Sequence, residues 1–292
     1  MSKPEPIWTT EAMGLASYKG PLRTTSNGTT GLTMDGAVNY IDKYDYNAEL
    51  IPFLRKLNYG TWKEEIYDCD DQALWGLAHL RHMFPGVPAG VASGETAKKG
   101  ERHALITMWY REKGGKIEQA FYDPRHKDLV KFGKIDSIVA FPPSDKPENT
   151  KPVLQSFENE MLVYDRIRNI YSKDEIIGYL EKEVYETKCD DLRYHSTKDE
   201  NDFNRLWKYS EYDRALWAMV HAHRDFLGCP VGVAKGTMSG DTYPIWVVIV
   251  YYKENDDPKK DLIWTYFDTH PETPKEEKEI ASDKFTAKMI FM

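Results

Sequence analysis

The sequence predicts an α+β protein in which one unit of helices and antiparallel strands occurs twice. Residues 41–145 show a helical pattern followed by several strand patterns, and residues 161–292 repeat that order. The main helix and the strand after it match between the two segments at a constant separation of 142 residues. We therefore divide the chain into an N-terminal arm (1–40), a first copy (41–145), a linker (146–160) and a second copy (161–292).

The overall composition excludes several functional classes. The 292 residues carry a net charge of −8 and contain no cluster of Lys or Arg, so we expect no binding to nucleic acids. No apolar run reaches the roughly 18 residues that a membrane-spanning helix needs, and residues 1–6 do not resemble a signal peptide. Hydrophobic residues make up 41% of the chain, which is enough for a substantial core. We expect a soluble, cytoplasmic protein of two domains.

Three cysteines, Cys69, Cys189 and Cys229, stand at unrelated spacings. An odd number argues against a disulfide framework, and no pair has the short spacing of a zinc site. The sequence therefore predicts at least one reduced thiol.

Two helices are predicted in the first copy. Apolar residues recur at helical spacing over residues 47–57, which indicates a short helix. A longer helix begins at Cys69, because Asp68 is a suitable N-cap and apolar residues recur at helical spacing over residues 73–83. Residues 84–86, Phe-Pro-Gly, end it. Cys69 would then lie in the first turn, where unpaired N–H groups and the helix dipole favour a thiolate.

The rest of each copy predicts strands joined by tight turns. Short apolar runs bounded by Gly, Pro, Asp and Lys mark these strands. The first copy has a turn and strand over residues 86–94 and strands over 104–110, 117–122 and 135–141. Residues 84–92, 105–110, 118–123 and 135–141 have their counterparts in residues 226–234, 247–252, 263–268 and 285–291 of the second copy.

Residues that occur in both copies are expected to serve the fold. Ala73-Leu74-Trp75 recurs as Ala215-Leu216-Trp217, and His79 recurs as His221. The large aromatic residues are expected in the core or between the copies, with a peptide or glycan groove as the alternative. Those aromatic residues include Trp109, Trp246 and Trp264.

Residues that differ between the copies point to chemistry instead. A nucleophile and its base would be lost together if one copy kept a reaction and the other kept only the shape. Independent drift of two surface positions is the alternative. The first copy has Cys69 and His103 where the second has Glu211 and Ile245, whereas Asp123 keeps a counterpart in Asp268.

Several features of the first copy follow one another in a characteristic order. They are Cys69 at a helix start, Ala73 four positions later, the Gly-Val-Pro-Ala turn at 86–89, His103-Ala104 opening a strand, and Tyr122-Asp123-Pro124 ending the next one. Together they resemble the transglutaminase-like branch of the papain-like cysteine peptidases. The string Asp68-Cys69-Asp70-Asp71 is similar to phage and bacterial transglutaminase-like cysteine proteinases and, more loosely, to the protease domain of fungal agglutinins. The resemblance covers about residues 60–141, with a degenerate echo over about 205–291.

This resemblance implies a papain-like fold, with a helix packed on an antiparallel sheet, and a catalytic triad. Cys69 would be the nucleophile, and His103 would be the general base and later the general acid. Asp123 would orient the imidazole. The second copy would be a pseudo-enzyme half that packs against the first or shapes its cleft.

The triad depends on how two strands pair. If Gly114-Gly115 forms a two-residue turn, Asp123 faces Ile106 and His103 points to the opposite face of the sheet. If the loop is residues 111–115, His103 faces Asp123 directly. We predict the longer loop.

Two further groups of residues lie close to Cys69 in the sequence. Papain-like enzymes place a Gln shortly before the Cys, and this chain has none there, so Trp62 or Tyr67 is the candidate for a second oxyanion donor beside the Cys69 N–H. Asp70 and Asp71 would oppose ionisation of a nearby thiol. We expect them to act as helix-dipole partners or to bind a divalent cation. No other cofactor is expected.

The leading hypothesis is a cysteine hydrolase that cleaves an amide bond of a protein or peptide through a thioacyl intermediate on Cys69. Acyl transfer to an amine and deamidation of glutamine would use the same chemistry. The alternative is a non-catalytic structural or interaction protein, of phage origin, whose duplicated fold is a scaffold. The arm 1–40 would then contact a neighbouring subunit or a virion partner. Such a protein would lie in the host cytosol or in the virion.

Overall fold

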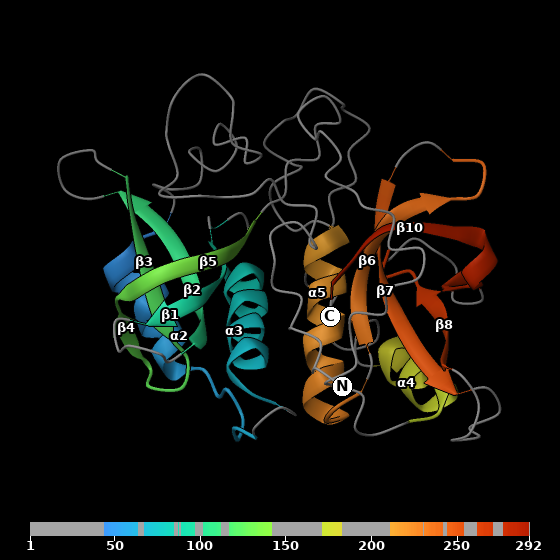
Figure 1. Ribbon diagram of the computed structural model, residues 1–292, viewed down its shortest axis with the longest axis horizontal. Coiled ribbons are helices and arrows are strands. Elements are labelled where there is room, and N and C mark those ends of the chain that lie inside the picture. Colours follow the sequence, from blue (N-terminus) through green and yellow to red (C-terminus); the bar gives the residue numbers. More distant parts are fainter. Residues whose placement is uncertain are drawn as a thin grey trace.

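The computed structural model places two antiparallel sheets on either side of a central pair of helices (Figure 1). Within the described residues, four α-helices pack on the two sheets, and one sheet is curled into a half-barrel. The predicted arm 1–40, the predicted linker 146–160 and Cys189 lie outside the described part of the chain. The structure describes residues 44–63, 67–84, 87, 89–96, 102–111, 117–141, 171–182, 211–229, 231–241, 244–253, 262–270 and 277–291.

The first half of the chain forms one unit of helices and sheet. Its sheet has the strand order β4-β3-β2-β1-β5, and the pairings are antiparallel. The elements are a π-helical turn η1 (Tyr46–Leu50), α2 (Ile51–Lys56), α3 (Cys69–Met83), β1 (Ala89–Thr96), β2 (Arg102–Arg111), β3 (Ile117–Asp123), β4 (Asp128–Val130) and β5 (Phe132–Phe141).

The second half forms a unit with a matching arrangement. Its strand order is β10-β6-β7-β8-β9, which is the order of the first sheet read from the other edge, with β6 to β10 in the places of β1 to β5. The elements are α4 (Lys173–Tyr179), α5 (Glu211–Asp225), β6 (Val231–Met238), β7 (Pro244–Lys253), β8 (Leu262–Phe267), β9 (Glu279–Ile280), a short 3-10 turn η5 (Ser282–Lys284) and β10 (Phe285–Phe291).

Local signals in the sequence located the main elements. Helix α3 begins at Cys69 with Asp68 as its N-cap and ends at Met83, as predicted. The short helix predicted over 47–57 corresponds to η1 followed directly by α2. Strands β4 and β9 were not predicted, because segments of three and two residues are too short to show a period of two.

Helices α3 and α5 pack against each other between the two sheets (Figure 1). Trp75 lies against His221 with ring centres 4.7 Å apart, and Trp217 lies against His79 with ring centres 4.6 Å apart. One hydrophobic cluster contains buried residues of both halves. The residues common to the two copies therefore lie where the halves meet, in agreement with a role in the fold.

The same interface contains a second pair of equivalent contacts with different chemistry. The Arg224 guanidinium lies 4.2 Å from the ring centre of Trp75, and the His82 ring lies 4.4 Å from that of Trp217. Arg224 follows His82 by the same 142 positions that separate the two tryptophans. A guanidinium and an imidazole thus cover equivalent indole rings.

Two of the three tryptophans expected in the core are buried there, and the third is not. Trp109 is 4% exposed and Trp246 is 5% exposed, whereas Trp264 on β8 is 40% exposed. The neighbouring strand β9 pairs with β8 only at Tyr266 and Phe267. Trp264 lies beyond that short cover, so the prediction of a buried position was wrong.

Candidate active site at Asp123

Cys69 is the first residue of α3, and a capping box closes the N-terminal end of this helix. The Asp68 side chain accepts the Asp70 N–H (3.3 Å), and the Asp71 side chain accepts the Asp68 N–H (3.2 Å), which completes a capping box. The Gln72 N–H donates to the Asp68 carbonyl at 3.0 Å. Cys69 is half-buried and forms no disulfide in the described part of the chain. Its predicted place at a helix N-terminus is confirmed.

His103 lies at the same end of the unit as Cys69. A short connection leads from the end of α3 to Ala89 at the start of β1, so β1 runs back along the helix. A Cβ atom at Gly76, in the middle of the helix, would touch Ile106 in the middle of β2. His103 pairs with Gly94, near the far end of β1. His103 therefore lies, like Cys69, towards the N-terminal end of α3.

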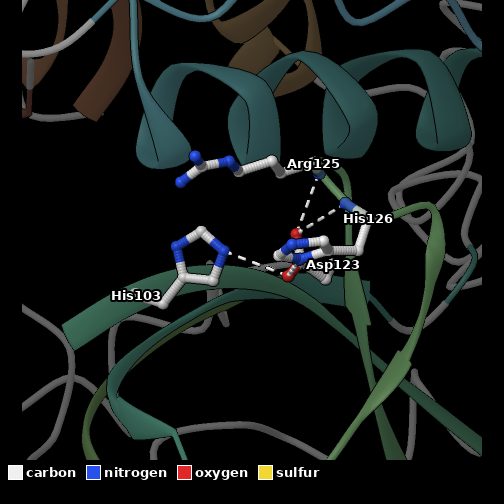
Figure 2. Close-up of polar contacts among 4 residues, drawn as sticks. All are labelled: His103, Asp123, Arg125 and His126. Carbon is white, nitrogen blue, oxygen red and sulfur yellow. Dashed lines mark hydrogen bonds and ion pairs between the residues drawn. The ribbon is translucent and has the colours of Figure 1, made fainter. Parts of the chain in front are cut away.

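The His103 and Asp123 side chains meet across β2 and β3 (Figure 2). His103 Nε2 lies 3.2 Å from Asp123 Oδ2, and the two side chains are 11% and 3% exposed. Ile106 pairs with Tyr122, so the same register places Asp123 opposite Leu105. His103 is thus a diagonal neighbour of Asp123 on one face of the sheet.

The predicted contact between these side chains is confirmed, but the predicted register is not. Strand β2 continues through Arg111, so the five connecting residues are 112–116 rather than 111–115. The direct pairing of His103 with Asp123 was therefore wrong. The observed register differs from the predicted one by one residue on each strand, two in total. Side chains alternate along a strand with a period of two, so both side chains stay on one face of the sheet.

Asp123 ends β3, and its carboxylate binds groups from two elements. Oδ1 accepts the Arg125 N–H (2.8 Å) and the His126 N–H (3.3 Å), which closes the turn between β3 and β4. Oδ2 lies 2.6 Å from His126 Nδ1 in addition to its contact with His103 (Figure 2). Burial opposes ionisation, but the hydrogen bonds from His103 and His126 hold the pKa of Asp123 well below its usual range. The ionised carboxylate can only accept, so the proton of a neutral His103 ring is on Nε2.

The equivalent residue of the second half keeps part of this arrangement. Asp268 Oδ1 accepts the His270 N–H at 2.8 Å, just as Asp123 Oδ1 accepts the N–H two residues along. The sequence has Ile245 in the place of His103 and Pro271 in the place of His126. Closure of the turn is therefore common to both halves, whereas His103 and His126 have no histidine at the matching positions of the second half.

The structure gives no contact between Cys69 and His103. Within the described residues, the hydrogen-bonding partner of His103 is Asp123. Ala104 and Ile106, which alternate with His103 along β2, belong to the core beneath α3. Cys69 would therefore approach His103 around the end of the helix. The full triad stays a prediction, although two of its three members are in contact.

The two proposed oxyanion donors lie in different surroundings. Tyr67 is 2% exposed, and its N–H donates to the Lys63 carbonyl at 2.8 Å, so this N–H is already used. Trp62 is half-buried, and its ring centre lies 4.7 Å from the Arg125 guanidinium carbon. Of the two, Trp62 is the one next to the turn that follows Asp123.

The two aspartates after Cys69 have separate roles. Asp71 binds the Asp68 N–H with one oxygen, and its other oxygen lies 3.0 Å from His223 Nδ1. The expectation that Asp71 binds a cation is therefore not supported. Ligand atoms of Asp68, Cys69 and Asp70 all lie within 4.8 Å of one another. Zn²⁺ accepts both thiolate and carboxylate ligands, so these three donors could hold a cation, and cation binding at Asp70 stays a prediction.

The sequence reasoning overlooked His126 and Arg125. His126 contacts Asp123 although its side chain is 66% exposed, and Arg125 packs over Trp62. The available signal was local, because an Asp that closes a turn brings the residue three positions later back to its own carboxylate. The periodicity of helices and strands does not report such a contact.

Comparisons with known proteins identify no relative: no family model, no curated protein and no solved structure matches this chain. Within the described residues, no helix has both the length and the apolar character needed to cross a membrane. The function of the site has to be inferred from its own geometry.

Proposed function

We propose that the protein is a cysteine hydrolase that cleaves an amide bond of a protein or peptide, with Cys69, His103 and Asp123 as its catalytic residues. The observation that carries this proposal is the 3.2 Å contact between His103 Nε2 and Asp123 Oδ2. It is the contact that holds a catalytic imidazole in one orientation, and it lies towards the N-terminal end of the Cys69 helix. The second half has Ile245 and Glu211 at the matching positions, which removes both the base and the nucleophile.

The proposed reaction follows from which ring nitrogen is occupied. Because Nε2–H donates to Asp123, His103 Nδ1 is the nitrogen that takes the thiol proton from Cys69. The thiolate then attacks the carbonyl carbon, and the imidazolium returns its proton to the leaving amine as the C–N bond breaks. Water, deprotonated by the same nitrogen, releases the acid from the thioester. An amine in place of water would give acyl transfer, and a glutamine side chain as substrate would give deamidation.

We also infer that the chain is a tandem duplication of a transglutaminase-like, papain-like unit. The common strand order supports this, as does the constant separation of 142 positions between α3 and α5, β1 and β6, and β2 and β7. The register agrees as well, because Ala89 pairs with Met108 and Val231 pairs with Val250. The second half would then be a pseudo-enzyme that kept the fold without the nucleophile.

A non-catalytic function is the second candidate, and two observations favour it. Among the described residues, the structure gives no hydrogen bond between Cys69 and His103, and the Oδ1 bond of Asp123 closes a turn that Asp268 also closes. In this case the duplicated fold is a scaffold, and the arm 1–40 joins a neighbouring subunit or a virion partner. Catalytic hydrogen bonds can tighten only when substrate binds, so the first observation does not rule out the enzyme.

The experiment that separates the two candidates is alkylation with iodoacetamide between pH 5.5 and 9.5, followed by peptide mapping. A Cys–His pair would give Cys69 an alkylation midpoint well below the ordinary value of about 8.5. His103→Ala should raise this midpoint towards 8.5 and leave the protein folded. Cys229 is an internal reference, because burial raises the pKa of its thiol and it should react slowly at every pH.

The matched control is His126→Ala. His126 contacts the same Asp123 oxygen as His103, but it lies on the exposed side of the turn. We expect this variant to leave the Cys69 midpoint within about 0.3 of wild type. A wild-type midpoint near 8.5 that does not move in His103→Ala would overturn the hydrolase proposal.

A further inference from the structure

Two pairs of side chains, which we call ties, join α3 to α5 at opposite ends of the helix pair: Asp71 with His223, and Arg81 with Asp213. At one end, Asp71 Oδ1 lies 3.0 Å from His223 Nδ1. At the other end, Arg81 binds Asp213 through two hydrogen bonds, from Nε to Oδ1 and from Nη2 to Oδ2. Asp213 follows Asp71, and His223 follows Arg81, by 142 positions. The ties are therefore equivalent in the two halves, and they show that the helices run antiparallel.

Each tie also reaches the backbone that leads into the first strand of its own half. His223 Nε2 lies 2.6 Å from the Val231 carbonyl oxygen, where β6 begins. Arg81 Nη1 donates to the Val87 carbonyl at 3.1 Å, just before β1. The His223 and Arg81 side chains thus each connect their own helix, their own sheet and the helix of the other half.

The two ties differ in what lies beside them. Asp71 also accepts the Asp68 N–H, so the carboxylate that binds His223 completes the capping box of the Cys69 helix. Arg81, which binds Asp213 of α5, lies ten residues further along α3 from Asp71, a distance of about 15 Å. One tie therefore acts on the first turn of α3, and the other acts at the start of α5.

His223 is the side chain of the second half that contacts the Asp71 carboxylate. The carboxylate is 4% exposed, and burial raises the pKa of Asp71 although the hydrogen bond from His223 opposes this. The Asp68, Tyr67 and Cys229 side chains also interact electrostatically with this carboxylate. Without His223, the capping carboxylate would lose its charge-assisted bond in a buried place.

We propose that His223, in the second half, is a positioning residue for Cys69: it holds Asp71 in the capping box and so orders the first turn of the helix that begins with the proposed nucleophile. The second half then contributes to the site of the first without supplying a catalytic group. The effect on the chemistry rests on the proposed function, whereas the effect on the helix turn does not.

The test compares His223→Gln with Arg81→Gln, which breaks the equivalent tie away from Cys69. Amide hydrogen exchange, read by mass spectrometry, follows the amides of Asp68, Asp70 and Gln72, whose hydrogen bonds belong to the cap and the first turn. His223→Gln should speed exchange in a peptide covering residues 68–72 about tenfold, because local opening becomes easier. Arg81→Gln should leave that peptide within about twofold of wild type and speed exchange in residues 211–215 instead.

The reactivity of Cys69 gives the second readout. His223→Gln should change the Cys69 alkylation rate at pH 7.5 at least about threefold and move its midpoint towards 8.5, because the ordered N–H groups of the first turn favour the thiolate. Arg81→Gln should change neither quantity. If both variants lose stability equally and residues 68–72 exchange alike in both, His223 is only a structural tie and the proposal is wrong.

Asp71→Asn tests the proposal even if His223→Gln fails to fold. An asparagine can accept the Asp68 N–H and donate its amide N–H to the Nδ1 of a neutral His223 ring, so the bonds survive without a charge. Exchange over residues 68–72 should stay within about threefold of wild type, and a tenfold increase in a folded protein would overturn the proposal. If wild-type Cys69 proves to be an ordinary thiol, the hydrolase proposal fails, but the exchange contrast between His223→Gln and Arg81→Gln still decides the role of His223.

Discussion

Asp123 in the first half and Asp268 in the second hold the same turn, yet their surroundings differ. In both, Oδ1 accepts the N–H two residues later at 2.8 Å. Asp123 also binds His103 and His126 through Oδ2, and these bonds lower its pKa. An aspartate at this position therefore has a structural use that needs no chemistry. His103 and His126, whose positions are Ile245 and Pro271 in the second half, therefore distinguish the two halves more than the aspartate does.

The helices α3 and α5 likewise combine residues that the two halves share with residues that differ between them. Trp75, His79 and their counterparts Trp217 and His221 make equivalent contacts across the interface. Cys69 and Glu211 begin the two helices and are not equivalent in chemistry. Residues that pack in the interface recur at matched positions of the two halves, whereas the first residues of the two helices differ.

The largest expected effect concerns the two cysteines. Cys69→Ala should lower amide hydrolysis at least about 10³-fold, since the nucleophile is removed, while unfolding free energy changes by less than about 1 kcal/mol because the side chain is half-buried. Cys229→Ala should leave activity intact and destabilise by about 1–2 kcal/mol, because Cys229 is 2% exposed in the core. Peptide hydrolysis and urea unfolding measure both. If Cys69→Ala and Cys229→Ala hydrolysed peptides equally well, Cys69 would not be the nucleophile, and the expected functional difference between the halves would be contradicted.

The next effect concerns Gly76 and its counterpart Ala218. A Cβ atom at Gly76 would lie 2.3 Å from Ile106 Cδ1 and 2.9 Å from Tyr59 Cε1. Gly76→Ala should therefore destabilise by about 1–2 kcal/mol, although alanine favours a helix. Ala218→Gly should also destabilise by about 1–2 kcal/mol, because it loses helix propensity and a buried methyl group. The two opposite substitutions should therefore both lower the unfolding free energy. A Gly76→Ala protein with a higher unfolding free energy than wild type would contradict the close packing of α3 on β2.

The smallest expected effect is the contribution of Asp123 to the pH dependence of the unfolding free energy. The folded pKa lies below the unfolded value of about 3.9, so ionised Asp123 stabilises the fold at neutral pH, and this contribution is lost as the pH falls below about 4. Asp123→Asn keeps an acceptor for the turn and should cost about 1–2 kcal/mol at pH 7, less at pH 3. Urea unfolding at both pH values measures the difference. Asp268→Asn shows how much of the change belongs to the turn alone, and a cost of Asp123→Asn that does not fall with pH would show that ionisation is not the cause.

Much of the fold could be predicted from local sequence, and the site could be predicted only in part. The boundaries of α3 followed from a cap and a stop signal that lie within a few residues of the helix ends. The contact between His103 and Asp123 was predicted, but its register was not, because a shift of one residue on each strand leaves the alternation unchanged. His126 was overlooked because its contact is made by a turn and has no periodic signature.

The sequence by itself determined where the helices and main strands lie, which residues recur in both halves, and which chemical groups only the first half has. These depend on neighbours a few positions apart or on comparing one half with the other. The tertiary structure decided that Asp71 meets His223, 152 residues away, and that His103 meets Asp123 as a diagonal neighbour rather than as a direct partner. Contacts between distant residues depend on how helices and sheets pack, and a single sequence holds no local signal for them.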